Sequence, residues 1–558
     1  MRRTVPTPTR KPSRPKGQGQ WAMGHREPLN KNEQSKKDDN PLNVRQRIEG
    51  VYAHRGFDSI DPADLRGRFR WWGLYTQRKP GIAGGKTGVL EEEELDDKYF
   101  MMRVRMDGGQ LNLAQLRTIA GISKEFGRDT ADVTDRENVQ YHWIRVEDVP
   151  EIWRRLEAVG LDTQEACGDC PRVILGSPVA GVSTEEVIDP TPQIQEIYDR
   201  FIGDRSLSNL PRKFKSTIGW LPDSPYEVND ISLIGAHHPE HGPGFDLYVG
   251  GGLSTNPMFA PRLGVWVSQD DIVDVWVNVV RIFRDWGYRR LRTRARLKFL
   301  VKDWGPEKFR EVLESDAYLG RKLPDLEQPP VPEKLLDHIG VHKQNDGNYY
   351  IGVAPVAGRV SGTILDQLAD IAEKYGSDRV RATPLQKLLV LDIPENKIRD
   401  AVEDLRSIGL EAEPSQWRRN TMACTGIQFC KLAIVDTKDR ARDLVAELEK
   451  RVPELDVPIS IHVNGCPNAC ARTQTGDIGL KGQLVTNADG EQVEGFQVHL
   501  GGGHAAAASL GRKSRGLKVA SADLGDYVER LTRRYLAARS EGETFAQWVH
   551  RTEESELQ

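Results

Sequence analysis

The residues best suited to chemistry are four of the six cysteines, which form two pairs late in the chain. Cys424 and Cys430 have five residues between them, and Cys466 and Cys470 have three. Four thiolates that converge from two loops match the ligand set of a cubane 4Fe–4S cluster. Two other interpretations stay open. The pairs could be unrelated buried structural cysteines, or they could form a zinc site, although zinc ligand pairs usually lie about two to four residues apart.

The second pair stands in the run Asn-Gly-Cys-Pro-Asn-Ala-Cys, which ends at Cys470. Together with the preceding Cys-x5-Cys, this run resembles the cluster motif of the sirohaem-dependent sulfite and nitrite reductases, and most of all the ferredoxin-dependent sulfite reductases. The resemblance extends over nearly the whole chain. It implies a 4Fe–4S cluster on the four cysteines and a sirohaem whose iron is joined to that cluster through the sulfur of Cys470.

The same resemblance implies an anion pocket of two arginines and two lysines on the open side of the haem. Taken alone, each of these side chains would be interpreted as a solvated surface charge. The two lysines flank Phe214, so on a strand both would point to one face. Clustered cations can bind an oxyanion substrate and deliver protons to its leaving oxygen. The four residues are Arg103, Arg172, Lys213 and Lys215.

Two further polar residues lie near a predicted strand, the first just before it and the second on it. Arg136 and Gln140 match a stretch that holds haem carboxylates in the family, so the resemblance implies that they bind the cofactor. His142 follows on the same strand, and we interpret it as a buried structural histidine rather than a catalytic acid.

Cys167 and Cys170 have the Cys-x-x-Cys spacing of redox-active dithiols, and half a zinc site is also possible. A third interpretation comes from the resemblance, because some ferredoxin-linked sulfite reductases carry a thioether between a tyrosine and a cysteine beside the haem. Tyr75 and Cys167 match those two positions, so we hold a Tyr75–Cys167 crosslink as a hypothesis.

The elements that must position these residues occur twice. Patterns of strand, helix, strand and helix are predicted near residues 99–106, 113–126, 139–146 and 149–158, and again near 349–353, 365–375, 387–391 and 394–407. Later, the run that begins Gly-Phe-Asp at Gly244 is matched by Gly-Phe-Gln at Gly495, and both end in three glycines. The sequence therefore predicts two homologous halves around one site.

The predicted fold class is α+β with a two-fold internal repeat. By the resemblance, two ferredoxin-like units pair, and two larger α/β domains enclose sirohaem and the 4Fe–4S cluster. The expected divisions are a disordered basic tail at 1–47, ferredoxin-like half-domain 1 at 48–163, sirohaem- and substrate-binding domain 1 at 164–334, ferredoxin-like half-domain 2 at 335–412, and 4Fe–4S- and sirohaem-binding domain 2 at 413–558.

Composition excludes several classes of protein. Hydrophobic content of 38% and charged content of 29% fit a globular protein, and the lack of a long apolar run predicts no membrane span. Few cysteines indicate a reducing, cytoplasmic location without a disulfide framework. A net charge of −4 does not indicate a nucleic-acid binder. The basic tail lacks apolar periodicity, which predicts disorder, and an arm for an acidic partner or nucleic acid stays open.

The sequence lacks the strand–GxGxxG–helix fingerprint of a dinucleotide site, so electrons must come from another protein. By the resemblance, this donor is reduced ferredoxin, and the predicted function is assimilatory six-electron reduction of sulfite to sulfide by a monomer. The arginine-rich run Tyr288–Lys298 is one candidate docking surface. Two alternatives stay open: a ferredoxin-dependent nitrite reductase that makes ammonia, and a non-enzymatic iron–sulfur electron carrier.

Overall fold

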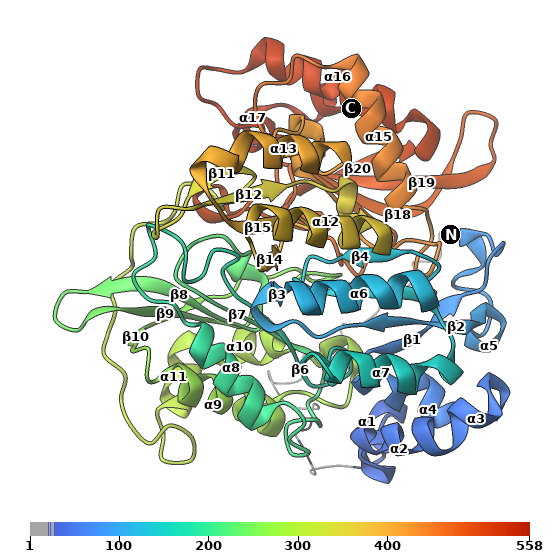
Figure 1. The fold of residues 1–558 in the computed structure, drawn as a ribbon, viewed down its shortest axis with the longest axis vertical. Helices are drawn as coiled ribbons and strands as arrows, with labels where there is room; N and C mark the ends of the chain where they lie inside the picture. The colour runs from blue at the N-terminus through green and yellow to red at the C-terminus, as the bar shows by residue number, and fades with distance from the viewer. Residues whose placement is uncertain (1–20, 22, 24–26) are drawn as a thin grey trace, which may run out of the picture.

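The computed structural model describes Trp21, Met23 and residues 27–558. Within these residues there are four sheets of five strands each, and they follow the predicted repeat. Each half has the sheet of a small ferredoxin-like unit and then the sheet of a larger unit. In Figure 1, the first half runs from blue to green and the second from yellow to red, and the two lie against each other. The predicted α+β fold with a two-fold internal repeat is confirmed.

The first ferredoxin-like sheet has the strand order β1-β2-β5-β4-β13 and is antiparallel throughout. Its second strand begins and ends three residues earlier than the sequence predicts, because it pairs with β1 from Met102 back to Asp96. The bounds are β1 Leu74–Arg78, β2 Asp96–Arg103, β5 Val139–Ile144, β4 Ala131–Val133 and β13 Arg359–Val360.

The second ferredoxin-like sheet has the equivalent order β11-β12-β15-β14-β3. Each small sheet therefore takes its last strand from the other half of the chain. This exchange joins the two units along a shared edge. The bounds are β11 Gly340–Lys343, β12 Tyr349–Val353, β15 Leu388–Ile393, β14 Arg379–Ala382 and β3 Gln110–Asn112.

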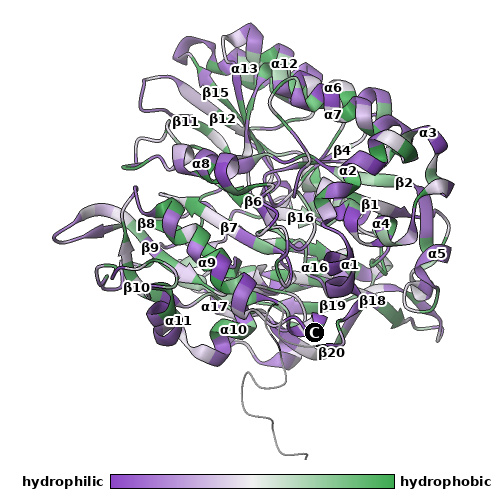
Figure 2. Ribbon diagram, turned by 90° about the horizontal axis from the view of Figure 1, so that it is seen from below, coloured by the Kyte–Doolittle hydropathy of each residue, from purple (hydrophilic) through white to green (hydrophobic). Residues whose placement is uncertain are grey.

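Each ferredoxin-like unit has two helices that alternate with its strands along the chain, and all four helices gather on one side of the molecule in Figure 2. α6 begins with a capping box in which Asn112 and Gln115 bond each other's backbone N–H groups. α6 and α12 pack together, and Leu116 and Leu365 belong to one core that spans both units. The bounds are α6 Leu113–Phe126, α7 Val149–Glu157, α12 Gly362–Tyr375 and α13 Ile398–Ser407.

The first larger unit is a mixed sheet, in which β6, β7 and β8 are parallel and two antiparallel strands follow. Its core lies between this sheet and the apolar face of α9. The bounds are β6 Pro171–Leu175, β7 Phe214–Gly219, β8 Ile231–His238, β9 Gly242–Val249, β10 Arg262–Val267, α8 Thr191–Phe201, α9 Ile272–Trp286, α10 Leu297–Trp304 and α11 Pro306–Leu313.

The second larger unit repeats this plan, with β16, β17 and β18 parallel and two antiparallel strands after them. Its core is separate from that of the first unit. The bounds are β16 Thr421–Ala423, β17 Ile461–Asn464, β18 Ile478–Thr486, β19 Gln492–Leu500, β20 Arg512–Ala520, α14 Gln416–Asn420, α15 Lys438–Arg451, α16 Leu524–Ala538 and α17 Phe545–Arg551.

The prediction of a disordered tail over residues 1–47 is wrong for its second part, and residues 1–20, 22 and 24–26 lie outside the described residues. α1 is almost wholly polar, so its sequence carries no apolar period, yet buried charges hold it against the first larger unit. The helices before β1 are α1 Lys31–Asp38, α2 Val44–Arg47, α3 Ala53–Arg55 and α4 Pro62–Arg66, and α5 Glu92–Leu95 lies between β1 and β2. No helix among the described residues is long and apolar enough to cross a membrane.

Candidate functional site

A cavity of about 300 Å³ is lined by residues from both halves of the chain. The first ferredoxin-like unit contributes Arg103 of β2 and the loop before β5, and the first larger unit contributes β6 and β7. From the second half, the loop after β17 brings the last cysteine of the motif to the cavity wall. The predicted site residues on this wall are Arg103, Arg136, Arg172, Lys213, Lys215 and Cys470.

The two predicted lysines reach the cavity because of the local strand pattern. Phe214 opens β7, is fully buried, and packs against Trp276 and Phe283 of α9. Lys213 precedes this strand and Lys215 lies on it, so the lysines flank the buried ring and both line the cavity.

The electrostatics of these lysines reflect crowding by other cations. Burial, together with the charge of Arg136, lowers the pKa of Lys215 to about 8. Burial and the charge of Lys215 lower the pKa of Lys213 well below its ordinary value. Neither ammonium group has a side-chain hydrogen-bond partner among the described residues, so both remain available to an anion in the cavity.

Arg103 connects the cavity to the cluster motif. It donates from Nη2 to Oε1 of Gln140 at 2.9 Å, and Gln140 donates from Nε2 to Oγ1 of Thr425 at 2.9 Å. Thr425 directly follows Cys424. Gln140 therefore does not line the cavity. It lies behind Arg103 and positions this arginine against the loop that carries Cys424.

Two other arginines are held by backbone carbonyl oxygens. Arg172 donates to the carbonyl oxygen of Gly168 from Nη2 at 2.7 Å and from Nε at 3.0 Å. Arg136 donates to the carbonyl oxygen of Val173 at 2.7 Å and to Oδ1 of Asn229 at 2.8 Å. Carbonyl partners fix each guanidinium without neutralising its charge, so the cavity stays cationic.

The four cysteines of the motif act on one another electrostatically, so they are neighbours in space. Burial and the thiol of Cys470 raise the pKa of Cys424 to about 12, and the same two causes raise the pKa of Cys430. Burial, with Cys470 again next, raises the pKa of Cys466. The backbone N–H of Gly465 donates to the Sγ of Cys424 at 3.2 Å. Among the described side chains, no group of three or more His, Cys, Asp or Glu residues is arranged to hold a single metal ion.

Several buried cationic donors around the cavity have no hydrogen-bond partner in the part of the chain that the structure describes. The Nε atoms of Arg103, Arg136 and Arg472 are buried without a hydrogen bond, and so is Nη1 of Arg472. A buried, unpaired guanidinium N–H is costly. A polycarboxylate in the cavity would satisfy these donors, so the residues present fit an anionic macrocycle, and the four thiols supply the soft donor set of an iron–sulfur cluster.

Cys167 is close enough to Tyr75 to act on its phenol. Burial, followed by the thiol of Cys167, raises the pKa of the Tyr75 phenol. Nη1 of Arg103 lies 3.1 Å from the Sγ of Cys167. Tyr75 does not line the main cavity. It lines a smaller adjacent one, of about 50 Å³, which it shares with Arg172.

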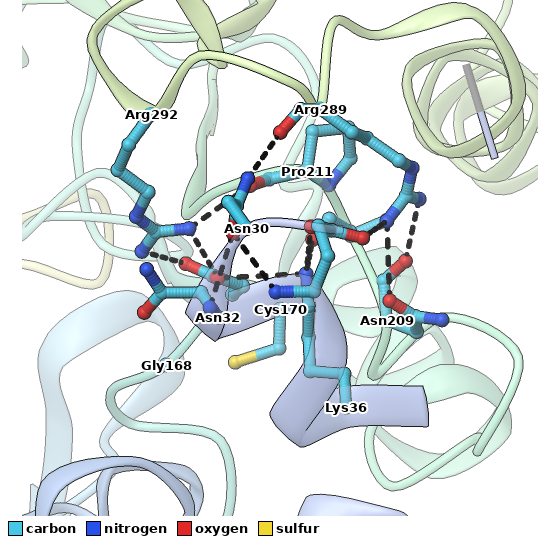
Figure 3. Close-up of polar contacts among 12 residues, drawn as sticks. Asn30, Asn32, Lys36, Gly168, Cys170, Asn209, Pro211, Arg289 and Arg292 are labelled. Carbon is cyan, nitrogen blue, oxygen red and sulfur yellow. Dashed lines mark hydrogen bonds and ion pairs between the residues drawn. The ribbon is translucent and has the colours of Figure 1, made fainter. Parts of the chain in front are cut away.

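The loop that carries Cys167 is held from beneath by α1, which Figure 3 shows in its contact with the first larger unit. Arg292 makes a bidentate contact with Asp169, through hydrogen bonds of 2.5 and 2.6 Å. Lys36 of α1 lies 3.6 Å from the same carboxylate and bonds Glu33 at 2.6 Å. Arg289 then pairs with Glu33 at 3.0 Å. This buried network fixes the segment between Cys167 and Arg172.

Several cationic cavity residues were not assigned to the site from the sequence, among them Arg212, Lys298 and Arg472. Arg472 follows Cys470 by two residues in a left-handed conformation (φ 53°), and its place beside the motif was the available signal. Arg212 and Lys298 also line the cavity, and burial lowers the pKa of Lys298 to about 7. No pattern distinguished these two from surface cations.

The arginine-rich run Tyr288–Lys298 is largely not a free docking surface. Arg289 is 2% exposed, and Arg296 pairs with the buried Asp230 at 2.8 Å. Arg292 is committed to Asp169. These arginines neutralise buried carboxylates of the fold, which a charge run in the sequence cannot reveal. His142 is fully buried and bonds Asp132, in line with the structural role predicted for it.

Comparison with known proteins agrees with this architecture. A family model described as the nitrite and sulphite reductase 4Fe-4S domain matches residues 167–323 and 416–558. A second model, the nitrite/sulfite reductase ferredoxin-like half domain, matches residues 92–159 and 342–408. Each model matches twice, once in each half of the chain.

Individual relatives cover the chain almost completely. A sulfite reductase [ferredoxin] of Mycobacterium tuberculosis is 58% identical over 98% of this chain and 100% of its own length. An assimilatory ferredoxin-dependent nitrite reductase of Haloferax mediterranei is 36% identical over 93% of this chain and 91% of its own. The solved structure of the Mycobacterium tuberculosis NirA protein superposes with a TM-score of 0.95, at 59% identity, over 97% of this chain and 100% of that one. This chain therefore belongs to the nitrite and sulphite reductase family.

Proposed function

We propose that this chain is a ferredoxin-dependent sulfite reductase, which takes six electrons from reduced ferredoxin to convert sulfite to sulfide. The observation that carries the proposal is the gathering of Arg103, Arg172, Lys213 and Lys215 around one cavity that Cys470 also reaches. Relatives named sulfite reductase [ferredoxin] match this chain over 98% of its length, which supports the same reaction here.

The proposed cofactors are a 4Fe–4S cluster and sirohaem. Cys424, Cys430, Cys466 and Cys470 would hold the cluster, and Cys470, which alone of the four lines the cavity, would link it to the haem iron. Arg136 and Arg472 would bind haem carboxylates, since both present buried donors without partners. Sirohaem supplies a Lewis-acidic iron and a path for electrons from the cluster.

The cavity cations would act on the substrate directly. Arg103 and Arg172 offer planar, permanently charged groups that can bind two oxygens of sulfite. Lys215 has a pKa of about 8, so it is largely protonated at neutral pH and can still release its proton to a leaving oxygen. Three oxygen atoms must leave as water, and proton donors in a dry cavity assist each departure.

We further propose that Tyr75 and Cys167 are joined by a thioether between the phenol ring and Sγ. The effect of Cys167 on the pKa of Tyr75 and the contact of Arg103 with Cys167 support this pairing. Forming the C–S bond removes one hydrogen from the ring and one from the thiol, and the two electrons would pass to dioxygen. The bond would fix the wall next to Arg172.

The enzyme is proposed to act as a cytoplasmic monomer. No disulfide joins any of the six cysteines, all of which the structure describes, and this suits a reducing compartment. Light scattering during gel filtration tests the monomer, since a mass near 62.7 kDa is expected and twice that mass would reject it. The divisions of the chain near residues 163, 334 and 412 remain proposals as well.

Spectra and stoichiometry of the purified holoenzyme test the proposed reaction. Sirohaem adds a Soret and a red absorption band that a cluster alone lacks, so their absence from well-loaded protein would leave only the electron-carrier alternative. With reduced ferredoxin as the donor, each sulfite consumed should yield one sulfide and oxidise six ferredoxins. Sulfite-independent oxidation of ferredoxin would contradict the proposal.

A further inference from the structure

The two ferredoxin-like units exchange one strand each, and this creates two equivalent corners. In the first corner, β13 pairs with β4 and sets Arg359 opposite Asp132. In the second, β3 pairs with β14 and sets Gln110 opposite Arg381. Each residue of one corner is matched by its repeat in the other, so the chemistry of the two corners can be compared directly.

In the first corner, the buried carboxylate has cationic partners. Asp132 accepts from Nε of Arg359 at 2.6 Å and lies 2.9 Å from Nε2 of His142. The ammonium of Lys438, at the start of α15, lies 3.8 Å from the same carboxylate. Although burial opposes it, the charges of Lys438 and Arg359 hold the pKa of Asp132 well below its ordinary value.

The second corner has the opposite sign, and its cation has no directly paired carboxylate among the described residues. Arg381, the repeat of Asp132, is 3% exposed, and its side chain has no hydrogen bond or ion pair with any residue that the structure describes. Gln110, the repeat of Arg359, donates instead to Oγ1 of Thr191 at 3.2 Å, at the start of α8. Burial lowers the pKa of Arg381 to about 10, so it remains a cation at neutral pH.

A cavity of about 340 Å³ lies at this second corner and is separate from the site of the proposed reaction. Two acids line it, but both already have partners, Asp107 in an ion pair with Arg105 at 2.6 Å and Asp162 in a hydrogen bond from Tyr198. Arg379, also on the wall, pairs with Asp392 at 2.5 Å.

The carboxylates of Asp189, Asp392 and Glu186 act on Arg381 only at longer range, because none of them forms an ion pair with it. Among the described residues, Arg381 is therefore the cation on this wall that no ion pair neutralises directly. A buried cation without a partner is unfavourable unless a ligand neutralises it. The volume lies within the range of small-molecule sites. The side-chain amides of Gln110 and Gln115 lie on the same wall. Each donates one N–H elsewhere, to Oγ1 of Thr191 at 3.2 Å and to the carbonyl oxygen of Val159 at 3.1 Å, and has a second N–H to offer.

We propose that this cavity binds a small oxyanion, with Arg381 as its charged anchor and the wall amides as hydrogen-bond donors. The ligand class is a phosphate, a sulfate or the carboxylate of a small organic acid. Because β3 and β14 come from different halves of the chain, the bound anion would also fasten the two ferredoxin-like units together. This inference does not depend on the proposed reaction.

Calorimetric titration of the holoenzyme with inorganic phosphate tests the site. The cationic cavity next to Cys470 also attracts anions, so the wild-type protein is expected to bind two. Arg381→Gln should bind phosphate at least tenfold more weakly in the Arg381 cavity, so that one of the two bound phosphates is lost. Lys213→Met should weaken phosphate binding only in the cavity next to Cys470. Arg381→Lys should recover part of the loss. Arg117→Gln, an equal charge change on the exposed face of α6, serves as the control.

Two results would overturn the proposal. One is an unchanged phosphate stoichiometry in Arg381→Gln, and the other is the loss of all phosphate binding in Lys213→Met alone. Parallel titrations with sulfate and with acetate distinguish inorganic oxyanions from carboxylates, since the preferred class should show the larger Arg381 dependence.

Thermal unfolding gives a second readout that does not depend on catalysis. In anion-free buffer, Arg381→Met should raise the midpoint temperature, because it removes a buried unpaired charge. Phosphate should then raise the midpoint of the Lys213→Met protein but not that of the Lys213→Met, Arg381→Met double variant. Equal phosphate shifts in these two proteins would mean that water, and not an anion, satisfies Arg381.

Discussion

Nη1 of Arg103 lies 3.1 Å from the Sγ of Cys167, which places a permanent cation against the sulfur beside the proposed substrate cavity. The same guanidinium lines the cavity. One arginine thus connects the wall at Cys167 with the anion pocket.

The Tyr75–Cys167 thioether can be detected by mass spectrometry. Tryptic digestion of active enzyme should yield one joined species, two hydrogens lighter than the sum of the Tyr75 and Cys167 peptides. Cys167→Ser and Tyr75→Phe should both abolish it, and Cys170→Ser should not. Separate, unmodified Tyr75 and Cys167 peptides from fully active enzyme would contradict the crosslink.

The pKa of Lys215, about 8, predicts the alkaline limit of activity. Because the protonated amine is the active form, kcat/KM for sulfite should fall as pH rises through about 8, approaching tenfold per pH unit. Lys215→Met should lower kcat by about 100-fold, the low end of the general-acid contribution, and should remove this limb.

Lys215→Arg provides the matched control for charge. It keeps the positive charge but does not release a proton in this range, so KM for sulfite should stay close to that of the wild type while kcat falls. A limb near pH 8 that persists in Lys215→Met would assign the titration to another group.

Substitution of Lys36 tests whether the charges of α1 stabilise the loop that carries Cys167. Lys36→Met leaves Glu33 with Arg289 and Asp169 with Arg292, so we expect a loss of only about 1 kcal/mol in unfolding free energy, less than for breaking an isolated buried pair. KM for sulfite should rise because Arg172 is held by the adjacent Gly168. Lys37→Met, at an exposed neighbour, should change neither value.

Part of the proposed site could be predicted from the sequence, because it rests on local motifs. The spacing of Cys424 to Cys470 and the alternation around Phe214 are local properties, and the family resemblance implied one shared site, in whose cavity Lys213, Lys215 and Cys470 are found. The repeat also located α6, whose apolar residues recur at helical spacing from Leu113 to Phe126. These features depend on neighbours along the chain.

Features that depend on distant partners could not be predicted. The exchange of β3 and β13 joins segments from different halves, and neither short strand carries a distinctive pattern. α1 has the sequence KNEQSKKD and is held by charges on Arg289 and Asp169, far along the chain. Arg381 looks like any exposed arginine until the fold buries it without a partner.

Asp132 should be important for stability, because it neutralises the buried Lys438 and the partly buried Arg359. Asp132→Asn leaves Arg359 and Lys438 without a carboxylate, so we expect a loss of about 3–5 kcal/mol in unfolding free energy. The folded pKa of Asp132 is lowered, so its stabilisation is complete above about 3.9, the usual unfolded pKa, and is lost as pH falls towards the folded value.

Urea unfolding of both proteins from pH 7 to pH 3 measures this effect. The difference between the wild type and Asp132→Asn should stay constant at the higher pH values and narrow at the acid end. A difference that is unchanged at pH 3 would mean that lost packing, and not lost charge, explains the variant.

We propose that sulfite is reduced in the cation-lined cavity. The most direct test is the ratio of kcat/KM for sulfite to that for nitrite, measured on the holoenzyme with reduced ferredoxin as the donor. A ratio well above one is the predicted result, and it should fall in Lys213→Met and Lys215→Met. A ratio well below one would contradict the account and identify the enzyme as the nitrite reductase of the same family.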